Sequence, residues 1–217
     1  LADLPGPKLR LGYFSGQPFL AAGTELTLRC GEEKGDATST TLPVEYLGLA
    51  EELHPGDPVL LSDGLIQLEV KSCQGNEVIC EVIEGGQISQ RKGINVPGTV
   101  VKLPAVGPRD EEALRHALSL GVEFIAVSYV RTAEDIKPVR RILDETQSEA
   151  WIISKIEHPM ALESLDEIIE ASDAVMVARG DLGVEIPPEE VPMAQERIVT
   201  SARSKGLPVI VATQMLE

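Results

Sequence analysis

The stretch from Asp173 to Pro187 reads D-A-V-M-V-A-R-G-D-L-G-V-E-I-P. Its apolar run, Ala174 to Ala178, predicts a strand buried on both faces, as in a parallel sheet. The run stops at Arg179-Gly180-Asp181, and in α/β folds functional groups collect at the carboxyl ends of such strands. One hypothesis is that Asp181 holds a metal ion there and that the glycines let a small anion approach the backbone. Taken alone, however, this stretch favours the alternative, an ordinary glycine turn with a solvated ion pair.

Strands and helices alternate on both sides of this stretch, between residues 98 and 217. Apolar runs predict strands over residues 124–130, 151–157, 174–178 and 208–213. Helical patterns with capping signals predict helices over residues 110–120, 132–147, 160–171 and 189–205. This alternation is typical of βα units around a parallel sheet. We therefore expect an α/β fold, namely part of a TIM-type (β/α)₈ barrel.

The chain before residue 98 has a different pattern of residues. Between residues 12 and 97, short β-like pieces are separated by Gly, Pro, Asn and Asp, and Gly75-Asn76 is a hairpin signal. These pieces predict a small all-β barrel or sandwich inserted into the larger fold as a lid domain. The expected division is a barrel strand end at 1–11, the inserted lid domain at 12–97, and an incomplete set of barrel βα units at 98–217.

Composition excludes several classes of protein. The net charge of -16 and the pI near 4.6 oppose binding to nucleic acid or to anionic membranes. The three cysteines contain no C-x-x-C pair, so neither a disulfide framework nor a zinc site is expected. No apolar run approaches the ~18 residues of a membrane span, and no secretory signal is visible. We expect a cytoplasmic protein.

Charged and hydroxyl side chains recur at the expected strand ends. Lys155 and Glu157 lie two residues apart in W-I-I-S-K-I-E and point the same way along a strand. A structural ion pair is the alternative to a functional one. Ser128, Asp181 and Thr213 stand near the carboxyl ends of the other strands, and in a barrel these positions converge on one face. Such a set binds a divalent cation through oxygens and an anion through the lysine.

The remaining charged candidates precede residue 98. Lys8 and Arg10 point to the same side of an extended segment, where they would meet a phosphate or remain solvated. Asp63 and Lys92 lie in short polar segments, which the sequence alone predicts to be plain turns.

Several of these motifs together closely resemble the pyruvate kinase family. The motifs run in order through the whole chain, and the M-V-A-R-G-D-L-G segment is the most specific of them. They are Asp3 with Gly6-Pro7, Ser62–Ile66, Lys92–Gly98, Lys155–Glu157, Met176–Ile186 and Ala212–Glu217. The resemblance implies a (β/α)₈ barrel with a lid domain after its third strand and a C-terminal regulatory domain. It also implies phosphoryl transfer from phosphoenolpyruvate to ADP, giving pyruvate and ATP in glycolysis.

The resemblance assigns roles to particular residues. Glu157 and Asp181 would ligate Mg²⁺ or Mn²⁺, Lys155 would neutralise charge on the phosphoryl group and enolate, and Thr213 would relay a proton. The other implied contacts are with substrate and nucleotide. The substrate carboxylate would meet Ala178, Arg179, Gly180 and Asp181; the phosphoryl pocket would include Ser128 and Tyr129; the nucleotide would meet Arg10, Asp63 and Lys92.

Two departures from the family pattern change the expectations. Many members read Asp-Thr-Lys-Gly-Pro-Glu where this chain has Asp3, Leu4 and, in place of Glu, Lys8. We predict that the Lys8 ammonium replaces the K⁺ these members require, so K⁺ is not needed. The family's first two barrel strands, eighth strand and C-terminal domain also have no counterpart in the chain. We therefore expect the isolated chain to be inactive and the intact parent to be a homo-oligomer, a tetramer by resemblance.

Two alternatives remain at this stage. Another Mg²⁺-dependent barrel acting on pyruvate-like enolates, such as an aldolase or lyase, would share the carboxylate pair but not the lid residues. A non-catalytic folded fragment is the alternative from a different class.

Overall fold

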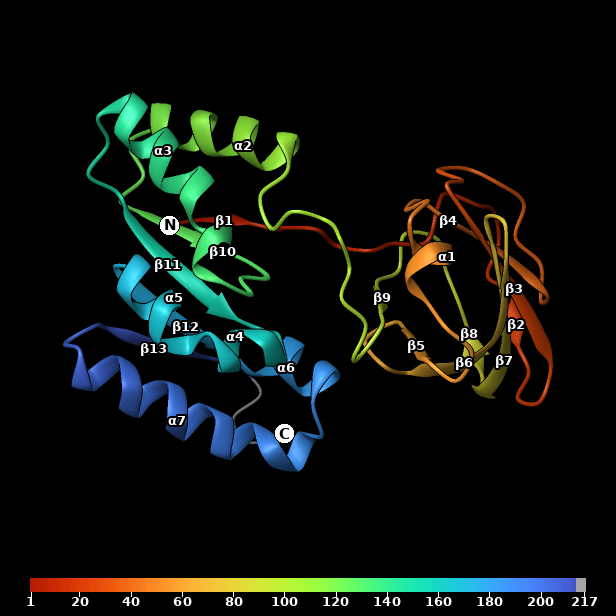
Figure 1. Ribbon diagram of the computed structural model, residues 1–217. Coiled ribbons are helices and arrows are strands. Elements are labelled where there is room, and N and C mark those ends of the chain that lie inside the picture. Colours follow the sequence, from red (N-terminus) through yellow and green to blue (C-terminus); the bar gives the residue numbers. More distant parts are fainter. Residues whose placement is uncertain (214–217) are drawn as a thin grey trace. The chain divides into compact units, whose positions relative to one another are not determined.

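The computed structural model describes residues 1–213, which divide into two compact units. Unit 1 consists of Leu1–Pro7 and the described residues from Leu103 onward, and unit 2 consists of Lys8–Lys102. Figure 1 shows the helices and parallel strands of unit 1 and the β-rich architecture of unit 2. Among the described residues, no helix has the length and apolar character needed to cross a membrane.

Unit 1 is built on a five-stranded sheet in the order β1-β10-β11-β12-β13, and every neighbouring pair is parallel. The α/β alternation expected from the sequence is confirmed. The strands are β1 (Ala2–Leu4), β10 (Phe124–Val127), β11 (Trp151–Ile156), β12 (Ala174–Ala178) and β13 (Val209–Ala212). Because the strands are parallel, their carboxyl ends lie along one edge of the sheet.

Helices connect these strands along the chain. They are α2 (Pro108–Ser119), η1 (Ala133–Asp135), α3 (Lys137–Thr146), α4 (Pro159–Glu163), α5 (Leu165–Ala171), α6 (Arg179–Glu185), η2 (Pro188–Glu190) and α7 (Val191–Ser204). The single helix expected over residues 160–171 is wrong in detail, because the helix breaks at Ser164. The strand expected over residues 124–130 ends at Val127, because Tyr129 has a φ of 59° that an extended strand does not allow.

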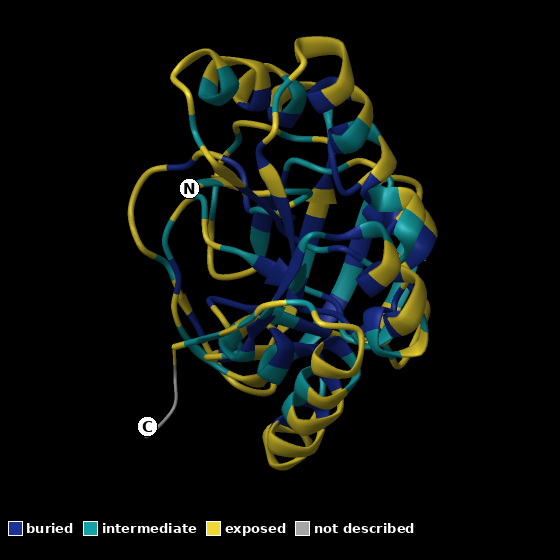
Figure 2. Ribbon diagram, turned by 90° about the vertical axis from the view of Figure 1, so that its left-hand side faces the viewer, coloured by how far each residue is buried: buried dark blue, intermediate teal, exposed yellow. Residues whose placement is uncertain are grey.

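The main core of unit 1 packs helices against one face of the sheet, with Ile125, Ile152 and Val175 among its fully buried members. Figure 2 shows buried residues concentrated on the strands and on the inward faces of the helices. The other face carries the small cluster of Ala126, Ile153 and Ala174. At β12, four of five residues are buried and the fifth is half-buried, so the predicted burial on both faces is confirmed there.

Unit 2 contains a six-stranded sheet in the order β4-β3-β7-β6-β5-β9 and a separate β2-β8 pair. Its elements are β2 (Phe19–Leu20), β3 (Glu25–Cys30), β4 (Thr41–Val44), α1 (Leu49–Glu52), β5 (Pro58–Leu61), β6 (Ile66–Gln74), β7 (Glu77–Glu84), β8 (Gly86–Gln87) and β9 (Ile94–Asn95). The hairpin predicted at Gly75-Asn76 is confirmed, since Gln74 pairs with Glu77 across it. Strand β4 was not expected, because its T-L-P-V sequence contains a proline.

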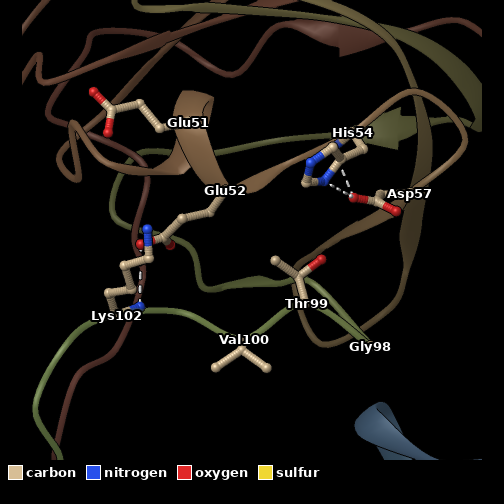
Figure 3. A pocket seen from close by; sticks show the side chains of 8 residues that line it. All are labelled: Glu51, Glu52, His54, Asp57, Gly98, Thr99, Val100 and Lys102. Carbon is tan, nitrogen blue, oxygen red and sulfur yellow. Dashed lines mark hydrogen bonds and ion pairs between the residues drawn. The ribbon is translucent and has the colours of Figure 1, made fainter.

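A cavity of about 340 Å³ lies beside α1 in unit 2 (Figure 3). Its lining residues are Glu51, Glu52, His54, Asp57, Gly98, Thr99, Val100 and Lys102. Glu52 is 9% exposed, and its Oε1 accepts hydrogen bonds from the Tyr46 hydroxyl at 2.8 Å and the Lys102 backbone N–H at 3.1 Å. This carboxylate therefore ties α1 to the segment in which unit 2 ends.

Candidate active site

The side chain of Lys155 is the centre of a polar cluster at the carboxyl ends of the unit 1 strands. Its Nζ lies 2.7 Å from Ser128 Oγ, 2.9 Å from Glu157 Oε1 and 3.3 Å from Asp3 Oδ1. These four residues come from β1, from β11 and from the segments that directly follow β10 and β11. The structure thus brings together three strand ends far apart in the sequence, as was expected for Ser128, Lys155 and Glu157.

Lys155 remains a cation in this setting. Its side chain is only 12% exposed, and burial lowers the pKa of an ammonium group. The carboxylates of Glu157 and Asp3 more than offset burial, so the net shift raises the pKa of Lys155 above its ordinary value. The cluster therefore holds a fixed positive charge that is partly shielded from water.

Glu157 is the most buried carboxylate of the cluster, at 4% exposure. Burial raises its pKa, the Lys155 ammonium opposes that shift, and the negative charge of Asp181 adds to it. One oxygen, Oε2, accepts a hydrogen bond from the Tyr129 backbone N–H at 2.8 Å. The other, Oε1, is buried and forms an ion pair with the Lys155 ammonium at 2.9 Å.

The segment after β1 is held close to the strand ends by a glycine. Gly6 has a φ of 65°, and a Cβ atom at this position would lie 3.1 Å from the Ser128 carbonyl oxygen. The Gly6 N–H also approaches Asp110 Oδ1 at 3.4 Å, which links the segment to the start of α2. Only glycine combines this conformation with this approach.

The stretch that follows β12 forms a helix and not a glycine turn. Helix α6 begins at Arg179, directly after the strand, and carries Asp181 in its first turn. Asp181 is exposed, whereas the Arg179 side chain donates to Gln195 Oε1 of α7 at 3.1 Å. The ordinary turn weighed for this stretch is therefore wrong, and Arg179–Asp181 form the first turn of a helix at the carboxyl end of β12.

Thr213 is exposed and directly follows β13, whose last residue, Ala212, pairs with Ala178. Its position is thus at the same edge of the sheet as the start of α6. The rest of the Ala212–Glu217 motif, from residue 214 onward, lies outside the described residues.

Unit 2 brings its three nucleotide candidates into neighbouring segments. Arg10 forms a β-bridge with Gly93, and its guanidinium donates to the Arg91 carbonyl at 2.9 Å. The Ser62 N–H donates to the Gly93 carbonyl at 3.2 Å, which sets the Asp63 turn beside the Lys92 turn. Asp63 itself has a φ of 59°. Lys8, the candidate K⁺ substitute, is exposed, while Leu4 is buried in the core of unit 1.

Two contributions to the cluster were not expected from the sequence. Asp3 contacts the Lys155 ammonium directly. This contact depends on the pairing of β1 with β10, which a local sequence pattern does not show. His158 is 3% exposed and packs its ring on Tyr129, with centroids 5.2 Å apart. Burial, together with Arg131, lowers the pKa of His158 to about 4, so the ring is neutral at pH 7.

The oxygen donors of this cluster suit Mg²⁺ bound in an open site, and do not suit a metal ion enclosed by protein ligands. Among the described residues, no group of three or more His, Cys, Asp or Glu side chains is arranged to hold a metal ion. Mg²⁺ is usually bound by one or two carboxylates and keeps water or substrate phosphate oxygens as its other ligands. Glu157, whose buried Oε1 contacts the Lys155 ammonium, and the nearby charge of Asp181 provide two such carboxylates.

The fold and the cluster define an α/β unit that places an ammonium group and carboxylates at the carboxyl ends of parallel strands. Residues 1–217 match the family described as the pyruvate kinase barrel domain. The chain belongs to the pyruvate kinase family.

Relatives and a solved structure agree with this assignment. The pyruvate kinase of Corynebacterium glutamicum is 47% identical over 217 residues, which are 100% of this chain and 46% of that protein. The pyruvate kinase of Mycobacterium tuberculosis is 46% identical over 220 residues, with the same coverage. A crystal structure of a pyruvate kinase from Cryptosporidium parvum aligns with a TM-score of 0.91 at 35% identity, covering 99% of this chain and 45% of that one. The chain thus spans about half the length of the curated relatives it matches.

Proposed function

We propose that the protein carrying this chain transfers the phosphoryl group of phosphoenolpyruvate to ADP, giving pyruvate and ATP. The observation that carries the proposal is the Lys155 ammonium, held by Ser128, Glu157 and Asp3 at the strand ends of a chain that matches pyruvate kinases along its whole length. A cation held in this way suits a reaction in which negative charge moves from a phosphoryl group to an enolate.

The fold behind this activity is a TIM-type (β/α)₈ barrel with an inserted all-β lid domain at residues 12–97. Five parallel strands with intervening helices support the barrel, and the separate β-rich unit 2 supports the lid. Closure of such a lid excludes water, which otherwise competes with ADP for the phosphoryl group.

Glu157 and Asp181 would hold Mg²⁺, or Mn²⁺ in its place. When bound, the ion supplies a Lewis acid that polarises phosphoryl and enolate oxygens. Lys155 would bind the phosphoryl group and stabilise charge on the enolate, while Asp3 and Ser128 fix the position of its ammonium. Thr213 would help relay the proton that converts the enolate to pyruvate.

The remaining contacts follow the family pattern. The first turn of α6, with Ala178 before it, would receive the substrate carboxylate at Arg179, Gly180 and Asp181 through backbone N–H groups. Ser128 and Tyr129 would line the phosphoryl pocket. Arg10, Asp63 and Lys92, which unit 2 holds in adjacent segments, would contact the nucleotide.

Lys8 would make the enzyme independent of K⁺, with Leu4 and Asp3 part of the same variant region. The Lys8→Glu variant of the full-length protein should then acquire a K⁺ requirement, because it loses the built-in monovalent cation. Turnover measured with and without KCl, at constant ionic strength, checks this. Strong K⁺ activation of the unmodified protein would contradict the assignment.

The proposed setting is cytoplasmic, with a homotetramer as the assembled form and no nucleic-acid or membrane partner. The net charge of -16 supports the absence of polyanionic partners. Cys30, Cys73 and Cys80 are all free thiols, as suits a reducing compartment.

Pyruvate formation from phosphoenolpyruvate, measured in the full-length protein with and without ADP and Mg²⁺, tests the function. We expect turnover only when phosphoenolpyruvate, ADP and Mg²⁺ are all present. Pyruvate release without ADP, or from a larger hydroxy-acid substrate, would indicate the lyase or aldolase alternative, which the match to pyruvate kinases over residues 12–97 does not favour. The same assay on the 217-residue chain tests the prediction that this chain does not turn over alone.

A further inference from the structure

Tyr129 has a backbone conformation that aromatic residues rarely adopt. Its φ is 59°, in the left-handed region, where a bulky side chain needs support from its surroundings. The residue stands two positions after the end of β10, so this conformation turns the chain away from the strand. Its backbone N–H donates to Glu157 Oε2 at 2.8 Å.

The Tyr129 ring is held by two side chains that are themselves held in place. His158 meets it edge-on, with centroids 5.2 Å apart and ring planes at 61°, and the Arg131 guanidinium lies 5.7 Å from its centroid. Nδ1 of His158 accepts the Met160 N–H at 3.2 Å, which caps α4, and Arg131 donates to the Leu103 carbonyl at 2.8 Å. These contacts stabilise the left-handed conformation.

The N–H bond makes the two oxygens of Glu157 unequal. Oε2 is occupied by a charge-assisted hydrogen bond, which fixes the orientation of the carboxylate. Oε1 is buried and forms an ion pair with the Lys155 ammonium at 2.9 Å. Only Oε1 is therefore directed into the cluster.

We propose that Tyr129 is a positioning residue whose backbone N–H anchors Glu157 Oε2, so that Oε1 is presented to the divalent cation. In metal binding, the ring acts by holding the backbone in the left-handed conformation. The inference rests on the proposed function in one respect, namely that Glu157 binds the metal. Groups that orient metal ligands in this way typically contribute about 10–100-fold to metal affinity.

Binding of Mn²⁺ to the substrate-free, full-length protein tests the inference, with free Mn²⁺ measured by electron paramagnetic resonance. Tyr129→Phe keeps the ring and should bind Mn²⁺ as the unmodified protein does. Tyr129→Ala loses the ring and keeps a Cβ that disfavours φ above zero, so its affinity should fall by roughly tenfold or more. Tyr129→Gly also lacks the ring but adopts this conformation freely, so it should recover most of the affinity lost in Tyr129→Ala.

If the ring served only general packing, Tyr129→Gly would lose Mn²⁺ affinity as Tyr129→Ala does. Recovery of Mn²⁺ affinity in Tyr129→Gly therefore points to the backbone conformation. Equal affinities for Tyr129→Ala and Tyr129→Gly, or unchanged affinity in Tyr129→Ala, overturn the inference. If Tyr129→Ala does not fold, Tyr129→Gly decides, since affinity near that of the unmodified protein supports the inference and a loss of about tenfold overturns it. Glu157→Gln separates the two proposals: unchanged Mn²⁺ binding in that variant contradicts the metal role of Glu157 itself.

Discussion

Individual residues at the cluster are placed by contacts that the sequence does not show directly. Lys155 and Glu157 were predicted to point the same way, and they form an ion pair of 2.9 Å. What remained open was whether the pair is only structural. Contact of the same ammonium with Ser128 and Asp3, from two other strand ends, shows a shared polar cluster and not an isolated pair.

Gly6 gives a prediction at the residue scale. Gly6→Ala should destabilise unit 1 by about 1–3 kcal/mol, because the new Cβ would meet the Ser128 carbonyl in a strained left-handed conformation. Gly121 is the matched control in the same unit, with a φ of 74° and no neighbouring atom within 4 Å of the position that a Cβ would take. Urea unfolding followed by Trp151 fluorescence compares the two variants. Equal destabilisation would show that the close approach at Gly6 costs nothing.

Two buried thiols give a second prediction, on pH. Burial raises the pKa of Cys30 and of Cys80 to about 12 from an ordinary value near 9. Between these values the unfolded state loses protons that the folded state keeps, so stability is full below about pH 9 and falls as the pH rises toward 12. Each thiol contributes a slope of at most ~1.4 kcal/mol per pH unit.

Unfolding free energies measured from about pH 8 to about pH 11 check this expectation. Cys80→Ala should lower the stability of unit 2 at all pH values but make its fall above about pH 9 less steep. An unchanged slope in that variant would contradict the account.

At the scale of elements, the sequence predicted the type of most helices and strands, but not where local contacts end them. Periodicity and caps identified β12 and the Thr132 helix start, where Thr132 N–H donates to Asp135 Oδ2 at 3.1 Å. The end of β10 depends on the left-handed Tyr129, which is stabilised by His158 from a different element. Such support between elements has no signal in a local pattern.

Glu52 gives the prediction at this scale. Glu52→Ala should destabilise unit 2 by about 1–3 kcal/mol, because the Tyr46 hydroxyl and the Lys102 N–H lose their common acceptor. Its exposed neighbour Glu51 is the control, and Glu51→Ala should stay within about 0.5 kcal/mol. Protection of the buried thiols of Cys30 and Cys80 against labelling, measured through urea unfolding, reports on this unit. Equal stability of the two variants would contradict the role of Glu52.

At the scale of the whole molecule, the change of sequence pattern near residue 98 predicted an α/β part and an all-β part in one chain, and both are present. The polar cluster was also predictable, because parallel strands bring their carboxyl ends to one edge whatever their separation in sequence. The contact of Asp3 with Lys155 could not be predicted, because it depends on the pairing of β1 with β10, a strand far along the chain. The K⁺ assignment, the nucleotide contacts and the assembled form stay predictions for the full-length protein.

The most direct test of the account is phosphoryl transfer by the Lys155→Met variant of the full-length protein. Methionine keeps most of the side-chain volume and removes the charge, and Lys205→Met removes an exposed ammonium of the same unit as a control. Pyruvate formation from phosphoenolpyruvate and ADP, with Mg²⁺ saturating, is the measurement. The account predicts a loss of at least ~100-fold in kcat for Lys155→Met, as for the removal of one preorganised charge-stabilising group, and little change for Lys205→Met. Normal turnover by a folded Lys155→Met variant would contradict it.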